Sequence, residues 1–219
     1  MSGNAKEGRR SYLPAAGHDW FLPLYDPVTR LIGADSARRE LIEQASLRRS
    51  SRVLDIGCGT GSLVVLIKRL HPELEVVGLD PDPKALARTR RKLERVGLSA
   101  QLDEGFSDEL PYPDASFDRV LSSFMMHHLE RDEKARTLTE VRRILRPEGS
   151  LHVLDFGGAE PRRDGFLARI LHRAESLQGH FDGQIPALMD QAGFVESKET
   201  AHRTTLLGRV AYYAASRSG

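Results

Sequence analysis

The hydrophobic positions along the middle of the chain form two alternating patterns. Short runs of adjacent apolar residues are typical of buried strands, and they lie at 52–56, 75–80, 99–103, 117–123 and 150–155. Between these runs, apolar residues recur every three or four positions, as in amphipathic helices, at 62–70, 83–96 and 133–145. Strands that alternate with helices form parallel sheets with right-handed crossovers, so the pattern predicts an α/β fold.

The last third of the chain departs from this alternation. Helical spacing is found at 165–177 and 184–192, and two strand patterns then follow at 195–200 and 210–215 with no helix between them. Strands that are joined directly can pair antiparallel. The sequence therefore predicts a mostly parallel sheet with an antiparallel last strand.

The N-terminal segment predicts a tail followed by a helical cap. Residues 1–16 are rich in Gly, Ser, Arg and Lys, as in flexible termini. Residues 17–47 start with an aromatic stretch around Tyr25 and continue with helical spacing that is broken near 33–35. A length of 219 residues suits one α/β domain, so we expect a single domain over 17–219.

The composition is that of an ordinary globular protein, with 40% apolar and 29% charged residues. A net charge of only +1 argues against dedicated nucleic-acid binding. The single cysteine, Cys58, can form neither an internal disulfide nor a structural zinc site, and we expect no metal. No apolar run approaches the roughly 20 residues of a spanning helix, and the polar start lacks a signal-peptide core. We therefore expect a cytoplasmic protein without stable membrane insertion.

A glycine-rich turn after the first strand is the most informative motif. Asp55 lies in the strand, and Gly57, Gly59 and Gly61 follow it immediately before a helix. Glycines let the backbone bend sharply and approach a ligand, and the N–H groups at a helix start suit a carboxylate or phosphate. Asp80 ends the second strand, where an acid reaches the hydroxyls of a bound ribose. The G-x-G-x-G spacing differs from the dinucleotide fingerprint G-x-G-x-x-G.

Four segments together resemble the class I S-adenosylmethionine (SAM)-dependent methyltransferases. They read DIGCGTG at 55–61, VGLD at 77–80, LPYPDASFD at 110–118 and LRPEGSL at 145–151. Glu148 stands where the family usually has Gly. Within the family, the chain is similar to the ubiquinone/menaquinone C-methyltransferase-like group of small-molecule enzymes. The resemblance covers roughly residues 45–215.

The resemblance implies a Rossmann-like seven-stranded sheet of order 3-2-1-4-5-7-6, with helices on both faces. It also implies an enzyme that moves a methyl group from SAM to a small-molecule acceptor and leaves S-adenosylhomocysteine. In this family, an insertion such as 156–186 forms part of a lid over the acceptor. Tyr25 would contact the cofactor or the acceptor from the N-terminal side.

The resemblance assigns the first strand and its turn to the amino-acid end of SAM. Gly57, Gly59 and Gly61 would hold the methionine part, and Asp55 would face its amino group directly or through water. Cys58 lies on the cofactor side of the same turn, and a small packing residue is the preferred interpretation over a nucleophile.

The remaining cofactor contacts implied by the resemblance come from later segments. Asp80 would hold the ribose hydroxyls, with Pro81 packing nearby. Phe106 and Ser107 would flank the adenine, and Ser122 would offer its backbone carbonyl near the methionine ammonium. Many relatives carry Asp or Asn where Phe106 stands. Stacking by Phe106, or a contact from the nearby Asp108, would then replace the usual polar contact to the adenine amine.

His127 and His128 are the candidate catalytic residues, together with Asp155. The two histidines follow the fourth strand, at the rim where the acceptor should sit. A histidine can take a proton from a phenol, a hydroxyl or an amine near neutral pH, although simple packing or a backbone hydrogen bond is the alternative. Asp155 ends the fifth strand and would either order the acceptor or cap the following turn.

Two other functions stay open on the sequence alone. An NAD(P)-dependent oxidoreductase would share the Rossmann-like sheet, although the glycine spacing and the final strand pair argue against it. A non-catalytic SAM-binding module is also possible, because a fold does not determine a function. The acceptor atom (C, N or O) and the oligomeric state, monomer or homodimer, are not determined.

Overall fold

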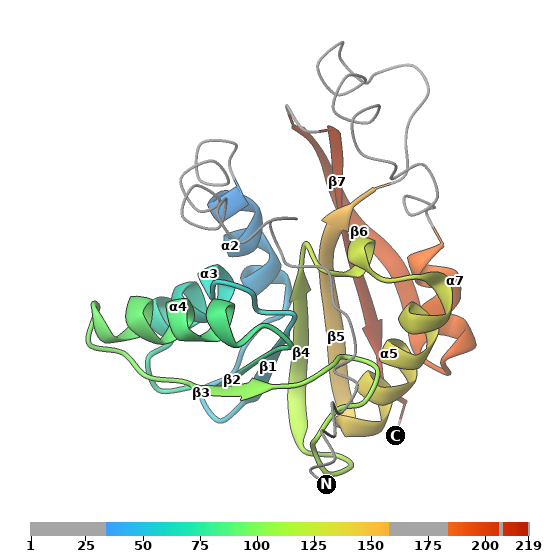
Figure 1. Ribbon diagram of the computed structural model, residues 1–219. Coiled ribbons are helices and arrows are strands. Elements are labelled where there is room, and N and C mark those ends of the chain that lie inside the picture. Colours follow the sequence, from blue (N-terminus) through green and yellow to red (C-terminus); the bar gives the residue numbers. More distant parts are fainter. Residues whose placement is uncertain (1–33, 158–183, 206–207, 219) are drawn as a thin grey trace, which may run out of the picture.

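Seven strands form one sheet in the computed structural model, which describes residues 34–157, 184–205 and 208–218 (Figure 1). The strands are β1 (Arg52–Ile56), β2 (Glu75–Asp80), β3 (Gln101–Glu104), β4 (Phe117–Ser123), β5 (Leu145–Phe156), β6 (Val195–Thr205) and β7 (Gly208–Ser216). The helices of the described part are α2 (Ala34–Gln44), α3 (Ser62–Leu70), α4 (Pro83–Glu94), η1 (Met126–His128, a 3-10 turn), α5 (Arg131–Ile144) and α7 (Ile185–Gln191).

The sheet confirms the predicted strand order, β3-β2-β1-β4-β5-β7-β6. β1 pairs in parallel with β2 and β4, and the pairs β2–β3 and β4–β5 are also parallel. β7 runs antiparallel to both β5 and β6. Consecutive parallel strands are connected through α3, α4 and α5, whereas β7 follows β6 directly in the chain, which permits the antiparallel pairing.

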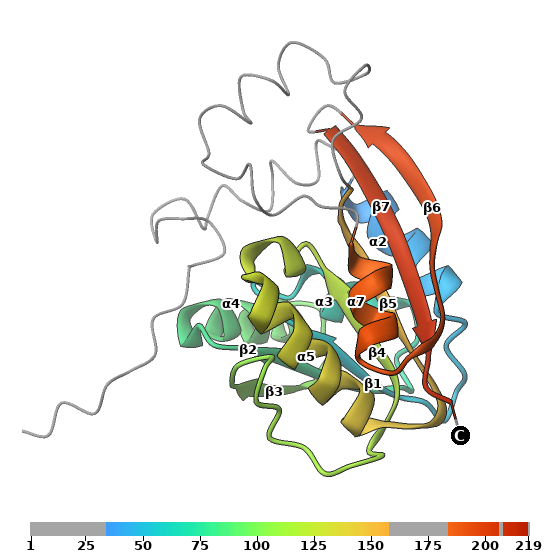
Figure 2. The ribbon, with the colours of Figure 1, turned by 90° about the vertical axis from the view of Figure 1, so that its right-hand side faces the viewer.

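Helices cover both faces of the sheet, as predicted (Figure 2). One core cluster joins the sheet to α5 and α7 through residues such as Leu138, Val141 and Leu188. The other joins it to α2, α3 and α4 and includes Leu41 and Ile67. Because a parallel sheet is buried on both faces, adjacent residues of a strand can both be apolar, and this explains the short apolar runs of the sequence, such as Val53-Leu54 in β1 and Val76-Val77 in β2.

The start of α5 and the start of β5 differ from the sequence prediction. α5 begins at Arg131 because Glu130 and Glu133 form a capping box, in which each side chain accepts from the other residue's backbone N–H. Leu145 was expected to end this helix, but it is already the first residue of β5 and pairs with Phe117 of β4. Residues 146–149, which lie between the predicted helix and the predicted strand, therefore form an irregularity within the strand pairing.

Glu148 lies in that irregular segment with a φ of 64°, in the left-handed region that disfavours residues with a Cβ. Its side chain is exposed. We expect Glu148→Gly to raise the free energy of unfolding by about 0.5–1 kcal/mol, because glycine adopts this backbone without strain. Urea denaturation would measure the change, and Glu148→Ala, which keeps a Cβ, should show no such gain. A glycine variant as stable as the alanine variant would contradict the strain.

Several predictions fall outside the described residues. These are the tail 1–16, the helix 165–177, most of the segment 156–186 and the first part of the cap 17–47, so the predicted domain boundaries stay predictions. Within the cap, α2 is described and begins at Ala34, next to the expected break. None of the helices in the described ranges has the length and apolar character to cross a membrane.

Candidate active site

A cavity of about 310 Å³ opens at the carboxyl ends of β1, β2 and β4. Ligands of open α/β sheets bind at this edge, where the strand order reverses. The residues that line the cavity are Arg38, Asp55, Gly57, Cys58, Gly59, Thr60, Ser62, Leu63, Leu79, Asp80, Pro81, Asp82, Gly105, Phe106, Ser107, Ser123, Phe124, Met125, His128, Leu129, Glu130 and Glu133.

The glycine-rich turn forms one side of the cavity, and its conformation requires glycine. Gly57, Gly59 and Gly61 have φ values of 68°, 53° and 76°, all in the left-handed region. A Cβ on Gly57 would lie 2.2 Å from Met125 Cγ, and one on Gly61 would lie 2.2 Å from Thr89 Cγ2. The turn is therefore specified by both backbone conformation and crowding.

Asp80 connects the end of β2 to the glycine-rich turn. Its Oδ2 accepts a hydrogen bond from the Gly59 N–H at 2.8 Å, and its Oδ1 accepts one from the Asp82 N–H at 2.9 Å. Burial raises the pKa of Asp80, and the two backbone hydrogen bonds oppose this shift. The carboxyl group is thus held firmly at the cavity wall, where its remaining lone pairs are available to hydrogen-bond donors of a ligand.

Asp55 and Arg38 place a buried carboxyl group and a guanidinium in the same cavity. Asp55 is 1% exposed, and its Oδ2 has no hydrogen-bond partner among the described residues. Burial raises the pKa of Asp55 to about 8, the Arg38 guanidinium lowers it and Asp80 raises it. Such a carboxyl favours a cationic ligand, because a neighbouring positive charge stabilises its ionised form.

Arg38 of α2 is the main functional candidate that sequence reasoning missed. It is 4% exposed, its Nε donates to Ser123 Oγ at 3.0 Å, and its guanidinium lies 5.6 Å from the Phe124 ring centroid. A signal was present, because position 38 shares the apolar helical stripe of Leu41, Ile42 and Ala45. Buried arginines are usually paired, and Arg38 does pair with Asp35 at 3.4 Å; its place in the cavity lining makes it a binding candidate.

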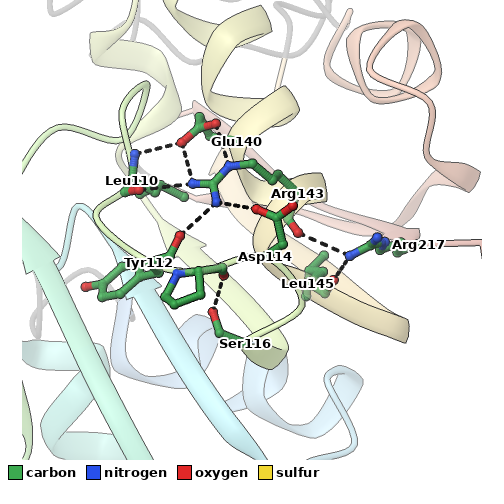
Figure 3. Close-up of polar contacts among 9 residues, drawn as sticks. Leu110, Tyr112, Asp114, Ser116, Glu140, Arg143, Leu145 and Arg217 are labelled. Carbon is green, nitrogen blue, oxygen red and sulfur yellow. Dashed lines mark hydrogen bonds and ion pairs between the residues drawn. The ribbon is translucent and has the colours of Figure 1, made fainter.

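α5 holds in place the loop between β3 and β4, which is the segment predicted to flank adenine (Figure 3). Arg143 donates to the carbonyls of Leu110 and Tyr112 and pairs with the carboxylates of Asp114 and Glu140. Glu140 in turn accepts from the Leu110 N–H at 2.9 Å. These bonds fix the loop that follows β3, and the first residues of this loop line the cavity.

Phe106 and Ser107 lie on this loop and line the cavity. The Ser107 hydroxyl is 2.9 Å from the Thr137 hydroxyl of α5. Asp108, the alternative partner for adenine, instead pairs with Arg136 at 3.0 Å and is not among the lining residues.

The candidate catalytic residues gather where β4 and β5 end. His127 Nδ1 lies 2.6 Å from Asp155 Oδ1, and the His127 and His128 ring centroids are 4.0 Å apart. His128 lines the cavity. Burial and the neighbouring His127 lower the pKa of His128 to about 4, while Asp155 raises it. His128 is therefore neutral near pH 7 and able to accept a proton.

The structure brings most of the predicted site residues to the cavity. Those that line it are Asp55, Gly57, Cys58, Gly59, Asp80, Pro81, Phe106, Ser107 and His128. Those described but not lining it are Gly61, Ser122, His127 and Asp155. Tyr25 lies outside the described residues. Across the described residues, His, Cys, Asp and Glu side chains do not gather in a group of three that could hold a metal.

Comparisons with known proteins agree with this geometry. The methyltransferase-domain family matches residues 53–149. The demethylmenaquinone methyltransferase of Thermus thermophilus is 41% identical over 151 residues, which cover 68% of this chain and 68% of that protein. The ubiquinone/menaquinone biosynthesis C-methyltransferase of Cronobacter sakazakii is 32% identical over 181 residues, covering 72% and 71%.

A solved structure shows the same fold. Phosphoethanolamine N-methyltransferase 2 of Haemonchus contortus, determined in complex with SAM, has a TM-score of 0.78 at 14% sequence identity. The alignment covers 97% of this chain and 61% of that one.

The fold and the cavity define a class I SAM-dependent methyltransferase. Within that class, the chain belongs to the family of the demethylmenaquinone and ubiquinone/menaquinone C-methyltransferases. It is therefore an enzyme that transfers a methyl group from SAM to a small molecule. The oxidoreductase and non-catalytic alternatives are not supported.

Proposed function

We propose that the protein methylates a ring carbon of a quinol of the demethylmenaquinol type, with SAM bound over the glycine-rich turn. The observation that carries this proposal is the 41% identity to a demethylmenaquinone methyltransferase across two thirds of both chains. The cavity wall supports it, because Phe124, Met125 and Leu129 provide an apolar surface beside His128. An aromatic acceptor would pack against such a wall.

The charged groups of the cavity fit the amino-acid end of SAM. The unpartnered Oδ2 of Asp55 would accept from the ammonium group, and Arg38 would bind the carboxylate in a charge-assisted contact. Asp80 would bind the ribose hydroxyls. When bound, SAM supplies a methyl group activated by its sulfonium, so the chain mainly needs to align donor and acceptor and exclude water.

His127, His128 and Asp155 are proposed to handle the acceptor, since they lie at the apolar end of the cavity. The other cofactor contacts stay predictions. They are the methionine contacts of Gly57, Cys58, Gly59 and Gly61, and the contacts to other parts of SAM by Pro81, Phe106, Ser107, Ser122 and Tyr25. Four further points also stay predictions: the lid over 156–186, an oligomeric state of monomer or homodimer, the absence of nucleic-acid partners and the cytoplasmic location.

The test combines binding and transfer. Isothermal titration calorimetry of the full chain should show binding of SAM and S-adenosylhomocysteine and none of NADH. With labelled SAM, the enzyme should then transfer methyl to short-chain demethylmenaquinol in detergent, and NMR of the product should show a new ring C–CH₃ group. Methylation at oxygen, or no transfer to the quinol, would refute this acceptor.

Asp80→Ala tests the cofactor assignment within the same experiment. We expect SAM affinity to fall by about 1–3 kcal/mol, because charge-assisted ribose contacts are lost together with the anchor of the Gly59 N–H. Asp190→Ala removes an exposed carboxylate on α7, away from the cavity lining, and should leave the affinity unchanged. Equal SAM affinity in the Asp80 variant and the wild type would contradict the ribose assignment.

A further inference from the structure

Three side chains form a connected unit at the acceptor end of the cavity. Asp155 lies at the end of β5, and His127 and His128 lie in η1. Among these three described residues, only His128 lines the cavity. The His127 ring contacts both of the others: its Nδ1 lies 2.6 Å from Asp155 Oδ1, and its centroid lies 4.0 Å from that of His128.

We propose that Asp155 and His127 are positioning residues for His128, and that His128 takes the hydroxyl proton of the acceptor. This inference rests on the proposed function, because it requires an acceptor with an acidic hydroxyl such as a quinol. It adds a division of labour among the three residues that neither the motifs nor the relatives assign.

The hydrogen bonds of Asp155 hold His127 in place. Its carboxylate is 1% exposed and accepts from the His127 N–H at 3.1 Å, the His127 Nδ1 at 2.6 Å and the Phe156 N–H at 2.8 Å. A carboxylate is an acceptor only, so Nδ1 of His127 must carry a proton. Both the position and the tautomer of His127 are therefore set from behind the cavity wall.

Ring packing transmits this placement to His128. The His127 ring contacts the Phe156 ring edge-on, with centroids 4.9 Å apart, and lies 4.0 Å from the His128 ring at an angle of 41°. The His127 N–H and ring are both bonded to one buried carboxylate, so η1 cannot rotate without breaking those bonds. His128 is thus presented to the cavity by a rigid support, which is what a proton acceptor requires.

The charges around His128 keep it available as a base. Desolvation and His127 hold its pKa at about 4, against an opposing effect of Asp155. The other charged groups of the cavity wall are Arg38, Asp55, Asp80, Asp82, Glu130 and Glu133. At pH 7 the imidazole therefore carries no proton on one ring nitrogen. A low pKa makes it a weak base, so proton transfer is coupled to attack on the methyl group rather than completed before it.

Proton transfer and methyl transfer occur together at the acceptor ring. The acceptor hydroxyl gives its proton to a ring nitrogen of His128, while the adjacent ring carbon forms a bond to the methyl group. The methyl–sulfur bond breaks, and its electron pair stays on sulfur, which becomes a neutral thioether. The methylated ring then loses its C–H proton as the oxygen regains one, so one proton is released per methyl group transferred.

Histidine NMR tests the positioning unit without any acceptor. In protein with labelled histidine, His128 should titrate near pH 4, the value set by its surroundings. His127→Gln should raise this midpoint, because the neighbouring ring that disfavours the cation is gone, while burial, the larger cause, still holds the pKa below its ordinary value. The matched control is Glu199→Gln, which removes the carboxylate of the exposed His202–Glu199 pair on β6 and should leave the His128 midpoint unchanged. A His128 midpoint unchanged by His127→Gln would overturn the proposal.

Kinetics provide the second test. His128→Gln should lower kcat roughly 100-fold to 10,000-fold and remove the acidic limb of the pH profile, with SAM affinity unchanged. Asp155→Asn should lower kcat at least about tenfold, yet add almost nothing in combination with His128→Gln, because it acts only through that residue. Losses that multiply in the double variant would show an independent structural role and overturn the positioning.

The two tests separate this inference from the proposed acceptor. If the wild type transfers no methyl to the quinol but the His128 midpoint moves as expected, the acceptor is wrong and the positioning unit stands. If transfer occurs and the midpoint does not move, the acceptor stands and the positioning unit is wrong.

Discussion

Replacing Gly61 with alanine is expected to destabilise the protein by about 2–4 kcal/mol and to weaken SAM binding at least about tenfold. The residue has a φ of 76°, and an added Cβ would lie 2.2 Å from Thr89 Cγ2 and 2.8 Å from Thr89 Cβ. Thr89 is fully buried, and its hydroxyl contacts the carbonyls of Gly59 at 2.9 Å and Ala85 at 3.2 Å. Thr89 cannot rotate away without losing these bonds, so the turn itself must move.

Gly97→Ala is the matched control for this prediction. Gly97 has a similar φ of 67°, but no atom lies within 4 Å of the Cβ that would be added. This variant should lose only the backbone contribution, about 1 kcal/mol, and bind SAM normally. Urea denaturation and calorimetry of both variants separate crowding from backbone strain, and equal losses in the two would contradict the crowding at Gly61.

His152 is expected to contribute a loss of stability as the pH falls into mild acid. It lies in β5 with 7% of its surface exposed, its Nε2 is 2.9 Å from Ser150 Oγ, and its Nδ1 has no partner among the described residues. Burial, and secondarily Arg119, lower its pKa to about 4. The unfolded chain binds a proton at this histidine below about pH 6.5, whereas the folded chain does not until about pH 4.

The sign follows from this difference in proton binding. The contribution of a neutral His152 is fully present above pH 6.5 and is lost as the pH falls from 6.5 toward 4, by about 2 kcal/mol at pH 5. His128 acts in the same direction, because its pKa is also lowered to about 4. Asp55 acts in the opposite direction, since its pKa is raised to about 8 and its contribution fades as the pH rises toward that value.

The difference in the pH dependence of stability between wild type and His152→Gln isolates the contribution of this histidine. Urea denaturation at pH 7 and pH 5 should show that the wild type loses about 2 kcal/mol more than the variant between the two pH values. His202→Gln, at an exposed position on β6, controls for removing a histidine and should behave like wild type. Parallel pH profiles of the wild type and His152→Gln would show that burial of His152 carries no proton linkage.

Much of the fold follows from local patterns in the sequence. The strands 52–56, 75–80 and 117–123 have the bounds that the apolar runs indicate, because strands buried on both faces place adjacent apolar residues in the core. The starts of α5 and β5 differ from the prediction. A capping box decides where α5 begins, and a pairing with Phe117 decides where β5 begins. Leu145 has an apolar side chain in either arrangement, so hydrophobicity could not distinguish them.

The cofactor side of the site was equally accessible from the sequence. Asp55, Gly57, Gly59 and Asp80 lie within or directly after two neighbouring strands, and parallel strands bring their carboxyl ends to one edge. Arg38 was not identified, because its importance depends on Ser123 and Phe124, which lie far along the chain. Only the packing of α2 against the sheet brings these residues together.

The sequence by itself determined the α/β class, the glycine-rich turn, the acid that ends β2 and the presence of two histidines after β4. These features depend on residues close together in the chain, where periodicity and backbone conformation act directly. Only the tertiary structure decided that His128 faces the cavity while His127 is bonded to Asp155, 28 residues away. The roles of adjacent, chemically identical side chains depend on which neighbours the pairing of β4 with β5 provides.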